Sequence, residues 1–386
     1  MAEAIKCVIM RGGTSKAVFL KEADLPQDED ARRRLILRVF GSPDRRQIDG
    51  LGGADPLTSK LAIIGPPPAD RPEAQLTYTF GQVEIDTPEI DWRSLCGNIS
   101  SAVGAYAIEE GMVAPSQPLT RVTVFNTNLG RLLSVEVPIT DGHPAERGDY
   151  VVPGVPGSGA RISVDFADTA GAATGALLPT GNPVDRLDVP GIGSIEASLV
   201  DIGNAHVFVR ARDLGLKGTE TAAEIDQDTA LRARLEAIRG AGAERMGMIA
   251  EAAQSRRDSP ATPILGVVSE PADYRNDIAG TTVRAHEVDL VSRLQFMQQT
   301  HKTYAGTSTV CTGVASRIPG TLVHQVARQR NEPSLRIGHP AGVIETETVV
   351  EPVAGGFSVH RATLGRTARR ILEGTVYVPD DTLLPA

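Results

Sequence analysis

The sequence predicts a duplicated fold in which α-helices and β-strands form two similar halves. Residues 195–210 align without gaps with residues 5–20, and both segments consist of a strand, a glycine-centred turn and a second strand. Residues 305–320 align in the same way with residues 96–111, in the same order along the chain. The 386 residues also include 39 Gly and 26 Pro, which is typical of many tight turns between short strands. Together these observations favour a duplication over a chance similarity of turn-rich segments.

The first half is predicted to alternate short strands with two helices. Apolar runs and alternating patterns predict strands at 5–9, 17–20, 61–64, 76–83, 122–125, 132–137 and 162–166. An amphipathic helix is predicted at 28–40, because Gly41-Ser42-Pro43 would end it. A second helix, made of small and apolar residues, is predicted at 102–110 and closed by Gly111. Small residues on this helix and on its repeat suit central helices that strands wrap closely.

A turn-rich cluster at 179–183 predicts the boundary between the halves. The first half is therefore expected to span 1–184 and the second half 185–386. In the second half, the repeat predicts a pair of strands within 195–210 and a helix within 305–320. Whether the last segment stays with the second half or crosses back to the first is left open.

Composition excludes several classes of protein. The net charge is −9 and the chain has no long basic run, so nucleic acid is not an expected partner. No apolar run approaches 18 residues and the first residues lack the apolar core of a signal peptide, which predicts a cytoplasmic protein without membrane contact. Cys7, Cys96 and Cys311 have the spacing of neither a disulfide framework nor a metal site. Without metal-ligand, GxGxxG or P-loop patterns, no metal, nucleotide or flavin is expected.

Both repeated helices begin with small polar residues that suit the binding of an anion. These residues are Gly97, Asn98, Ser100 and Ser101 in the first half, and Gly306, Thr307, Ser308 and Thr309 in the second. A helix start offers unpaired N–H groups and a partial positive charge, and a duplicated fold usually places its site in the cleft between its halves. A carboxylate is therefore expected to bind there. The alternative is that these side chains are ordinary helix caps, which would account for one or two of them.

Cys96 and Lys60 are the candidates for proton transfer at such a site. Cys96 directly precedes the first repeated helix, whose terminus stabilises a thiolate. The alternative, a buried structural cysteine, fits Cys7 and Cys311 better. The repeat has Ala305 in place of Cys96, which excludes a symmetric pair of thiols. Lys60 opens an apolar strand, so burial would make it a general base, although a strand-end lysine that reaches solvent is the commoner case.

The chain resembles the PrpF family, whose motifs it carries in order along nearly its whole length. The matching segments are MRGGTSK at 10–16, DGLGGADPLTSK at 49–60, CGNISSAVGAYAIEEG at 96–111, LLPTGN at 177–182 and RIPGT at 317–321. Family members include 2-methylaconitate cis-trans isomerase, 4-oxalomesaconate tautomerase, and methylitaconate and aconitate Δ-isomerases. The resemblance implies an α+β, diaminopimelate-epimerase-like fold, in which each half wraps a curved, mainly antiparallel sheet around a central helix. It also implies cofactor-free catalysis, with the family's catalytic lysine and cysteine at Lys60 and Cys96.

The substrate implied by the resemblance is a short unsaturated di- or tricarboxylate. Lys60 would remove or return an allylic proton, with Cys96 as its acid or base partner. Rotation in the delocalised intermediate would give cis-trans isomerisation, and 2-methylaconitate is the favoured substrate. Reprotonation at the far carbon would instead give a 1,3-shift in 4-oxalomesaconate, methylitaconate or aconitate. The segment 304–308 and the pair Ala105-Tyr106 depart from the family pattern near the site, so the substrate stays open.

Several residues are expected to hold this substrate. Helix-start N–H groups with polar side chains would stabilise enolate-like charge, and Arg11 with Ser15 on the glycine turn would bind a remote carboxylate. His301 would orient a carboxylate or else lie on a helix surface, and His206 is expected to be structural. The expected binding residues are Arg11, Gly12, Gly13, Ser15, Gly97, Asn98, Ser100, His301, Gly306, Thr307 and Ser308.

Two other classes of protein compete with the isomerase. A non-catalytic carboxylate-binding accessory protein could share the fold, although an intact Lys60 and Cys96 argue against it. An amino-acid epimerase would need two facing thiols, and Ala305 speaks against it. The only expected partners are the small-molecule substrate and, in a homodimer, a second copy of the chain; a monomer is the alternative.

Overall fold

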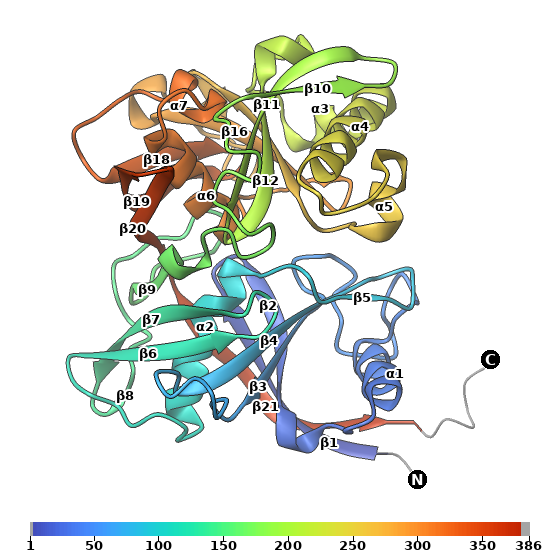
Figure 1. Ribbon diagram of the computed structural model, residues 1–386. Coiled ribbons are helices and arrows are strands. Elements are labelled where there is room, and N and C mark those ends of the chain that lie inside the picture. The colour runs from blue at the N-terminus through green and yellow to red at the C-terminus, as the bar shows by residue number, and fades with distance from the viewer. Residues whose placement is uncertain (1–2, 380–386) are drawn as a thin grey trace. The chain divides into compact units, whose positions relative to one another are not determined.

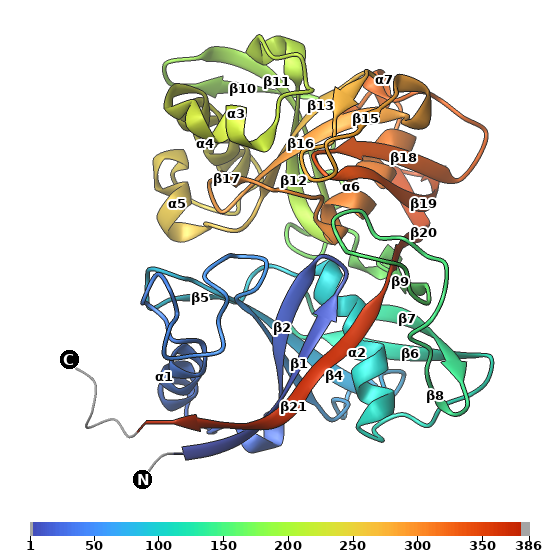
Figure 2. The same cartoon turned by 180° about the vertical axis from the view of Figure 1, so that it is seen from behind.

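The computed structural model describes residues 3–379, which form two compact units (Figure 1). The first unit contains the described residues up to Val151, Gly157–Ile162, and the described residues from Arg366 to 379. The second unit contains Val152–Pro156 and Ser163–Gly365. The last segment therefore belongs to the first unit, where β21 (Ala368–Val378) pairs antiparallel with β1 (Glu3–Gly12) (Figure 2).

The first unit contains the strands and both helices predicted between residues 5 and 140. Besides β1 and β21, its elements are β2 (Ser15–Lys21), α1 (Glu29–Phe40), β3 (Lys60–Gly65), β4 (Leu76–Val83), β5 (Ile90–Asp91), α2 (Gly97–Glu109), β6 (Leu119–Asn126), β7 (Arg131–Thr140) and β8 (His143–Pro144). Helix α1 begins where the pattern predicts, because the side chain of Asp28 accepts a hydrogen bond of 2.8 Å from the N–H of Ala31. It ends at Gly41, which adopts a left-handed conformation.

The second unit contains the predicted strand pair and the second repeated helix. The chain passes from the first unit through β9 (Ile162–Asp165). The elements that follow are β10 (Asp185–Val189), β11 (Gly193–Ile202), β12 (Asn204–Arg210), α3 (Ala222–Gln227), α4 (Thr229–Arg245), α5 (Ser255–Asp258), β13 (Ile264–Ser269), β14 (Tyr274–Arg275), β15 (Thr282–Val283), β16 (Leu290–Phe296), β17 (Gln299–Thr300), α6 (Gly306–Arg317), α7 (Leu322–Val326), β18 (Ser334–His339), β19 (Gly342–Val353) and β20 (Gly356–Arg366).

Both units share one order of strand pairing, which confirms the predicted duplicated α+β fold. In the first unit β1 is antiparallel to β2, β2 parallel to β3, β3 antiparallel to β4, β4 parallel to β6, and β6 antiparallel to β7. In the second unit the same alternation of antiparallel and parallel pairs joins β11, β12, β13, β16, β18 and β19. Antiparallel pairs are in the majority in both series.

One helix in each unit, α2 or α6, is buried on almost every side. A buried helix needs small residues where a strand approaches it closely. A Cβ on Gly104 of α2 would lie 2.8 Å from the side chain of Val137 in β7, and a Cβ on Gly313 of α6 would lie 2.6 Å from that of Thr346 in β19. Gly104 and Gly313 are aligned in the sequence repeat, so the repeat preserves this helix–strand contact.

The turn between the first two strands of each repeat meets the start of the central helix. A Cβ on Gly12 would lie 2.3 Å from the backbone oxygen of Asn98. Gly13 has a φ of +50°, and a Cβ there would lie 2.3 Å from Oδ1 of Asn98. In the second unit, Gly203 has a φ of +70°, and its Cβ would lie 3.1 Å from Cβ of Thr307. These glycines therefore let a turn approach the helix start within backbone contact distance.

A Gly12→Ala substitution should destabilise the protein strongly. The added methyl group meets backbone atoms of α2, which cannot rotate away as a side chain could, so we expect a loss of about 2–4 kcal/mol in the free energy of unfolding. Urea unfolding followed by circular dichroism measures it. Gly356→Ala is the control, because a Cβ there meets no atom within 4 Å. Equal unfolding midpoints for the two variants would contradict the close contact.

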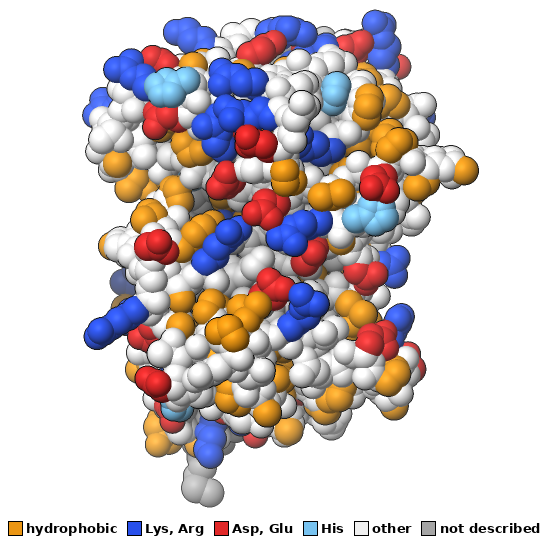
Figure 3. All heavy atoms as spheres, turned by 90° about the vertical axis from the view of Figure 1, so that its left-hand side faces the viewer, with side chains coloured by type: hydrophobic (Ala, Val, Ile, Leu, Met, Phe, Trp, Pro, Cys, Tyr) orange, Lys and Arg blue, Asp and Glu red, His pale blue; other side chains and the backbone are white. Residues whose placement is uncertain are grey.

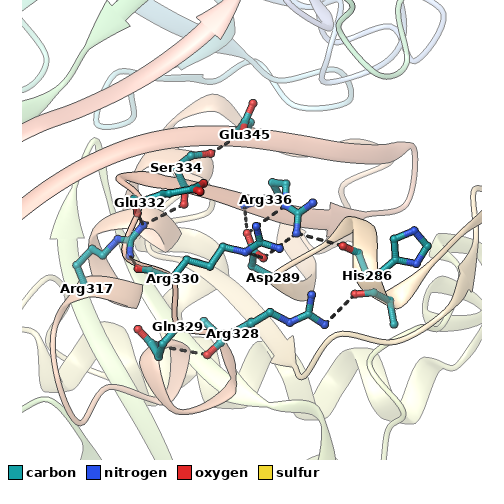
Figure 4. A network of polar contacts seen from close by, with 12 residues as sticks. His286, Asp289, Arg317, Arg328, Gln329, Arg330, Glu332, Ser334, Arg336 and Glu345 are labelled. Atoms are coloured by element: carbon teal, nitrogen blue, oxygen red, sulfur yellow. Dashed lines mark hydrogen bonds and ion pairs between the residues drawn. The ribbon is translucent and has the colours of Figure 1, made fainter.

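An arginine cluster in the second unit has a structural explanation (Figure 4). The buried carboxylate of Asp289 pairs with Arg336 at 3.0 Å and with Arg330 at 2.8 Å. Its Oδ2 also accepts the backbone N–H of Arg336 at 2.9 Å. Burial opposes ionisation of Asp289, but the hydrogen bonds from Arg336 prevail and lower its pKa. The cluster thus attaches β18 to the residue before β16.

Candidate active site

Lys60 lies inside the first unit at the start of β3, with 3% of its surface exposed. The strand register places it between Ala17 of β2 and Gln82 of β4. Its Nζ donates a hydrogen bond of 2.6 Å to Oε1 of Gln82 and lies 5.4 Å from the centre of the Phe80 ring. The structure therefore contains the buried lysine, and not the solvent-exposed one, of the two sequence alternatives.

The surroundings of Lys60 favour its neutral form. Burial lowers the pKa of Lys60, because the ammonium loses its hydration. The charges of Cys96, Asp55 and Asp91 act in the opposite direction, but the effect of burial is larger. A lysine with a lowered pKa is a neutral amine over more of the physiological pH range, and a general base must be neutral.

Cys96 is half-buried and immediately precedes the first turn of α2. Its backbone oxygen accepts the N–H of Ser100 at 2.9 Å, which fixes the start of the helix. Cys96 acts electrostatically on both Lys60 and Arg366 and favours the charged form of each. Cys96, Lys60 and Arg366 therefore belong to one electrostatically connected group, called the Lys60–Cys96 group below.

Asn98 connects this group to the glycine turn. Its Nδ2 donates to Oγ1 of Thr14 at 3.1 Å and to Oγ of Ser15 at 3.4 Å. Its Oδ1 accepts from Nε of Arg366 at 2.7 Å. The structure thus brings together five of the predicted binding positions at the start of α2: Gly12, Gly13, Ser15, Gly97 and Asn98.

Two residues of the site were missed in the sequence: Arg366, which belongs to the Lys60–Cys96 group, and Gln82, which accepts a hydrogen bond from Lys60. Arg366 is only 1% exposed, and burial lowers its pKa to about 10 against the opposing effects of Tyr150 and Cys96. No local pattern predicts its position, since it comes from the segment that returns to the first unit. Gln82 did carry a signal, because it continues the alternating buried positions Leu76, Tyr78 and Phe80 of β4 with a polar side chain.

Arg11 joins the glycine turn to the returning segment. Its Nη1 donates to the backbone oxygen of Gly13 at 3.0 Å, and to the backbone oxygen and Oγ1 of Thr367 at 2.9 and 3.0 Å. Burial lowers the pKa of Arg11, and the nearby Arg369 adds to this effect. These contacts give Arg11 a structural role, and its contact with a substrate carboxylate stays a prediction.

The hydroxyl groups at the start of α2 bond within the helix. Ser100 donates to the backbone oxygen of Cys96 at 3.0 Å, and Ser101 donates to that of Asn98 at 2.7 Å. Their protons are therefore engaged. The backbone N–H groups of Gly97 and Asn98, which a helix start leaves without intrahelical partners, are the better donors to an anion.

In the second unit, the hydroxyl groups of Thr307 and Ser308 at the start of α6 make different hydrogen bonds. Nδ1 of His206 lies 2.8 Å from the backbone oxygen of Asn204, so it donates, and Nε2 must accept from Oγ of Ser308 at 2.7 Å. Burial lowers the pKa of His206 to about 4, which keeps the ring neutral. Thr307, by contrast, accepts from Nδ2 of Asn204 at 3.0 Å, so its hydroxyl proton points elsewhere. His206 is buried, in agreement with its predicted structural role.

His301 does not lie on a helix surface, so that alternative was wrong. It follows the short strand β17 and is buried, with its ring 6.3 Å from that of Phe296 in an edge-on contact. Its Nδ1 accepts the N–H of Thr303 at 3.2 Å. The residues between β17 and α6 are irregular and not helical, which the sequence pattern did not distinguish.

The strand registers show which positions of the second unit correspond to the Lys60–Cys96 group. Ala17 of β2 pairs with Lys60, and the aligned Val207 of β12 pairs with Leu265. Cys96 precedes α2 as Ala305 precedes α6. Leu265 and Ala305 therefore occupy the positions of the lysine and the cysteine, so the second unit has neither residue at these positions.

The remaining described surface has a mixed character. Acidic and basic side chains are interspersed on the face in Figure 3.

Within residues 3–379, no group of three or more His, Cys, Asp or Glu side chains is arranged to hold a metal ion. The same residues include no helix with the length and apolarity needed to span a membrane. A pocket of about 420 Å³ in the first unit is lined by Lys6, Tyr106, Glu110 and others, but not by Lys60 or Cys96.

Comparison with known proteins places these residues in context. The family model described as "PrpF protein" matches residues 2–379. The 3-methylitaconate isomerase of Eubacterium barkeri is 52% identical over 97% of both chains. The 2-methyl-aconitate isomerase of Shewanella oneidensis (strain ATCC 700550 / JCM 31522 / CIP 106686 / LMG 19005 / NCIMB 14063 / MR-1) is 39% identical over 97% of both chains.

Solved structures agree with this comparison. A crystal structure of methylitaconate-delta-isomerase aligns with a TM-score of 0.83 and 51% identity, covering 100% of this chain and 98% of the other. A hydroxyproline epimerase from Agrobacterium vitis aligns with a TM-score of 0.56 and 14% identity, covering 98% of this chain and 94% of the other. The second likeness concerns the fold alone, and it confirms the predicted epimerase-like architecture.

Proposed function

The chain belongs to the PrpF protein family and is an isomerase of small-molecule acids, and on that premise we propose that it moves a proton within a short unsaturated di- or tricarboxylate. The observation that carries this proposal is the buried Lys60, with its lowered pKa, in one group with the Cys96 thiol. This arrangement supplies a base at the start of β3 and an acid at the start of α2, two groups of different chemistry.

The proposed reaction starts with removal of an allylic proton by Lys60. A carbon next to both a C=C bond and a carboxylate is acidic, because its carbanion is delocalised over the allyl system and the carboxylate oxygens. The proton moves to Nζ of Lys60, the double bond shifts, and the far carbon receives a proton from Cys96 or from solvent through Cys96. The substrate loses one proton and gains one, with no redox step and no added cofactor. Lys60 then releases its proton and Cys96 regains one by exchange with solvent, which restores both groups.

The substrate we place first is 3-methylitaconate or a close analogue. The sequence alone favoured 2-methylaconitate, whose cis-trans isomerisation uses the same intermediate. The relative that is 52% identical is named for 3-methylitaconate, whereas the relative named for 2-methyl-aconitate is 39% identical. A 1,3-allylic shift is therefore the outcome we propose, and 2-methylaconitate is the second candidate.

The donors at the start of α2 are proposed to hold the carboxylate that takes up negative charge. The N–H groups of Gly97 and Asn98 have the direction and partial charge for this role, and Arg366 adds a buried cation beside them. Arg366 donates to Asn98 through Nε, and its planar guanidinium has the charge and shape to bind a carboxylate. Gly12, Gly13 and Ser15 shape the turn that faces this helix start.

A carboxylate is also proposed to bind at the start of α6, and there Thr307 should matter more than Ser308. Thr307→Val removes a hydroxyl proton that can reach a ligand, so we expect KM to rise about 10-fold or more. Ser308→Ala removes a proton already given to His206, so KM should change less than about 3-fold while stability falls. Steady-state kinetics of both variants, with Thr307→Ser as the rescue, measure this. The opposite ranking of the two KM values would contradict it.

The function is tested by following candidate substrates in D₂O by proton NMR. The panel is 3-methylitaconate, 2-methylaconitate, aconitate and 4-oxalomesaconate, with enzyme dialysed against EDTA. We expect rearrangement of the vinylic signals of at least one substrate, with deuterium entering the product. A protein that binds these acids but produces neither rearrangement nor deuterium uptake would be the non-catalytic accessory protein instead.

A further inference from the structure

Gln82 faces Lys60 with its amide held in one orientation. Its Nε2 donates to the backbone oxygens of Pro56 and Ser59, each at 3.2 Å. Because carbonyl oxygens only accept hydrogen bonds, Nε2 must face them and Oε1 must face Lys60. The acceptor for the Lys60 amine, 2.6 Å away, therefore cannot be exchanged for a donor by an amide flip.

We propose that Gln82 is a positioning residue for the isomerase reaction, because its oxygen holds one N–H of Lys60 and thereby aims the nitrogen lone pair away from β4. This inference rests on the proposed role of Lys60 as the base. A neutral amine has two N–H bonds and one lone pair in staggered positions about the Cε–Nζ bond. With one position taken by the bond to Gln82, the lone pair is confined to the other two.

The neutrality of the Gln82 side chain has a second effect. A carboxylate in its place would form an ion pair and favour the ammonium form, which cannot act as a base. An apolar side chain would leave the buried amine without this acceptor and disfavour the ammonium form further. The other charged groups acting on Lys60 are Cys96 before α2, Asp55 in the loop before β3 and Asp91 in β5. All three raise the pKa of Lys60, so a negative charge at position 82 would raise this pKa further.

The second unit shows that a glutamine at this register does not need a lysine. Gln295 of β16 pairs with Leu265 of β13, as Gln82 of β4 pairs with Lys60 of β3. The Nε2 of Gln295 instead donates to Oγ1 of Thr300 at 2.7 Å. The contact between Gln82 and Lys60 is therefore specific to the unit that carries the Lys60–Cys96 group. It also makes Gln295→Met a matched control.

The test is a direct titration of Lys60 in the full chain. The sequence has only six lysines, so lysine labelled with ¹³C at Cε gives a simple NMR spectrum, in which Lys60→Met assigns the Lys60 signal. We expect Gln82→Met to lower the titration midpoint of Lys60 by about one to two pH units and Gln82→Glu to raise it. Gln295→Met should leave it unchanged. The rise of kcat with pH should move with the midpoint in both variants, while KM stays within about 3-fold. Gln82→Glu should lower kcat at pH 7 because more of Lys60 is protonated, and Gln82→Met should lower the plateau value of kcat at high pH because the lone pair is no longer aimed.

Shifts in opposite directions are a signature that general loosening of the fold does not produce. A Lys60 midpoint that stays at the wild-type pH in both Gln82 variants would overturn the inference, as would an equal shift in Gln295→Met. If one Gln82 variant fails to fold by circular dichroism, the direction of the other decides. The titration needs no substrate, so its result stands apart from the isomerase assay: an unmoved midpoint in an active enzyme rejects the role of Gln82 alone, and an inactive enzyme rejects the proposed function alone.

Discussion

Replacing Lys60 by methionine should abolish both isomerisation and the exchange of substrate hydrogen with solvent. Methionine keeps the length and packing of the side chain but cannot take a proton, and loss of a positioned general base costs about 10²–10⁴-fold in rate. We expect kcat/KM to fall by about 10⁴-fold or to drop below the limit of detection. Proton NMR in D₂O measures rearrangement and deuterium uptake in one experiment.

The pH dependence of the wild-type enzyme gives an independent check on Lys60. Since only the neutral amine accepts a proton, kcat should rise with pH through the pKa of Lys60. Burial places that pKa below the usual value of about 10.4, so the rise should be complete at lower pH than for an exposed lysine. Lys217→Met, at an exposed lysine of the second unit, is the control and should keep the wild-type rate and profile. Substantial turnover by Lys60→Met with an unchanged profile would remove Lys60 from the mechanism.

Replacing Cys96 by alanine should separate exchange from isomerisation. Lys60 would still remove the allylic proton and return a solvent-derived one to the same carbon, whereas the far carbon would lose its proton donor. We therefore expect isomerisation to fall about 10²–10³-fold while deuterium still enters the unrearranged substrate. The ratio of exchange to rearrangement, measured by NMR, should be higher in Cys96→Ala than in the wild-type enzyme.

Cys7→Ala is the control for this cysteine, because Cys7 is buried in β1 and is not among the groups acting on Lys60. It should keep the wild-type ratio. An equal loss of exchange and rearrangement in Cys96→Ala would mean that the thiol takes part in the first proton transfer. Isomerisation at the wild-type rate would exclude the thiol altogether.

The sequence was informative where a pattern is local or repeated. Two gap-free repeats predicted the duplicated topology, and the repeated Gly104 and Gly313 have the same packing reason in each unit. The position of Cys96 before a helix and of Lys60 at the start of a strand could also be predicted, since each depends on neighbouring residues alone. The catalytic roles of both residues stay predictions that the variants above test.

Contacts between distant segments were beyond the sequence. Asn98 receives its hydrogen bond from Arg366, and Arg11 donates to Thr367, more than 260 positions apart in both cases. Hydrophobic periodicity carries no information about such pairs. Gln82 is the instructive exception, because a polar side chain in an alternating series of buried positions marks a buried polar contact, although the pattern does not name its partner.

The return of the chain to its first unit has a consequence for synthesis. The ribosome makes Lys60 and Cys96 early, but Arg366 and β21 emerge only after the whole of Ser163–Gly365 has been made. Until then β1 is paired with β2 but lacks its second antiparallel neighbour, β21, and the helix start at Asn98 lacks its buried cation. The first unit is thus completed last, through contacts of very long sequence separation, which slow folding. An incomplete chain would carry Lys60 and Cys96 without the buried cation of Arg366, so the candidate site is complete only after the second unit has been made.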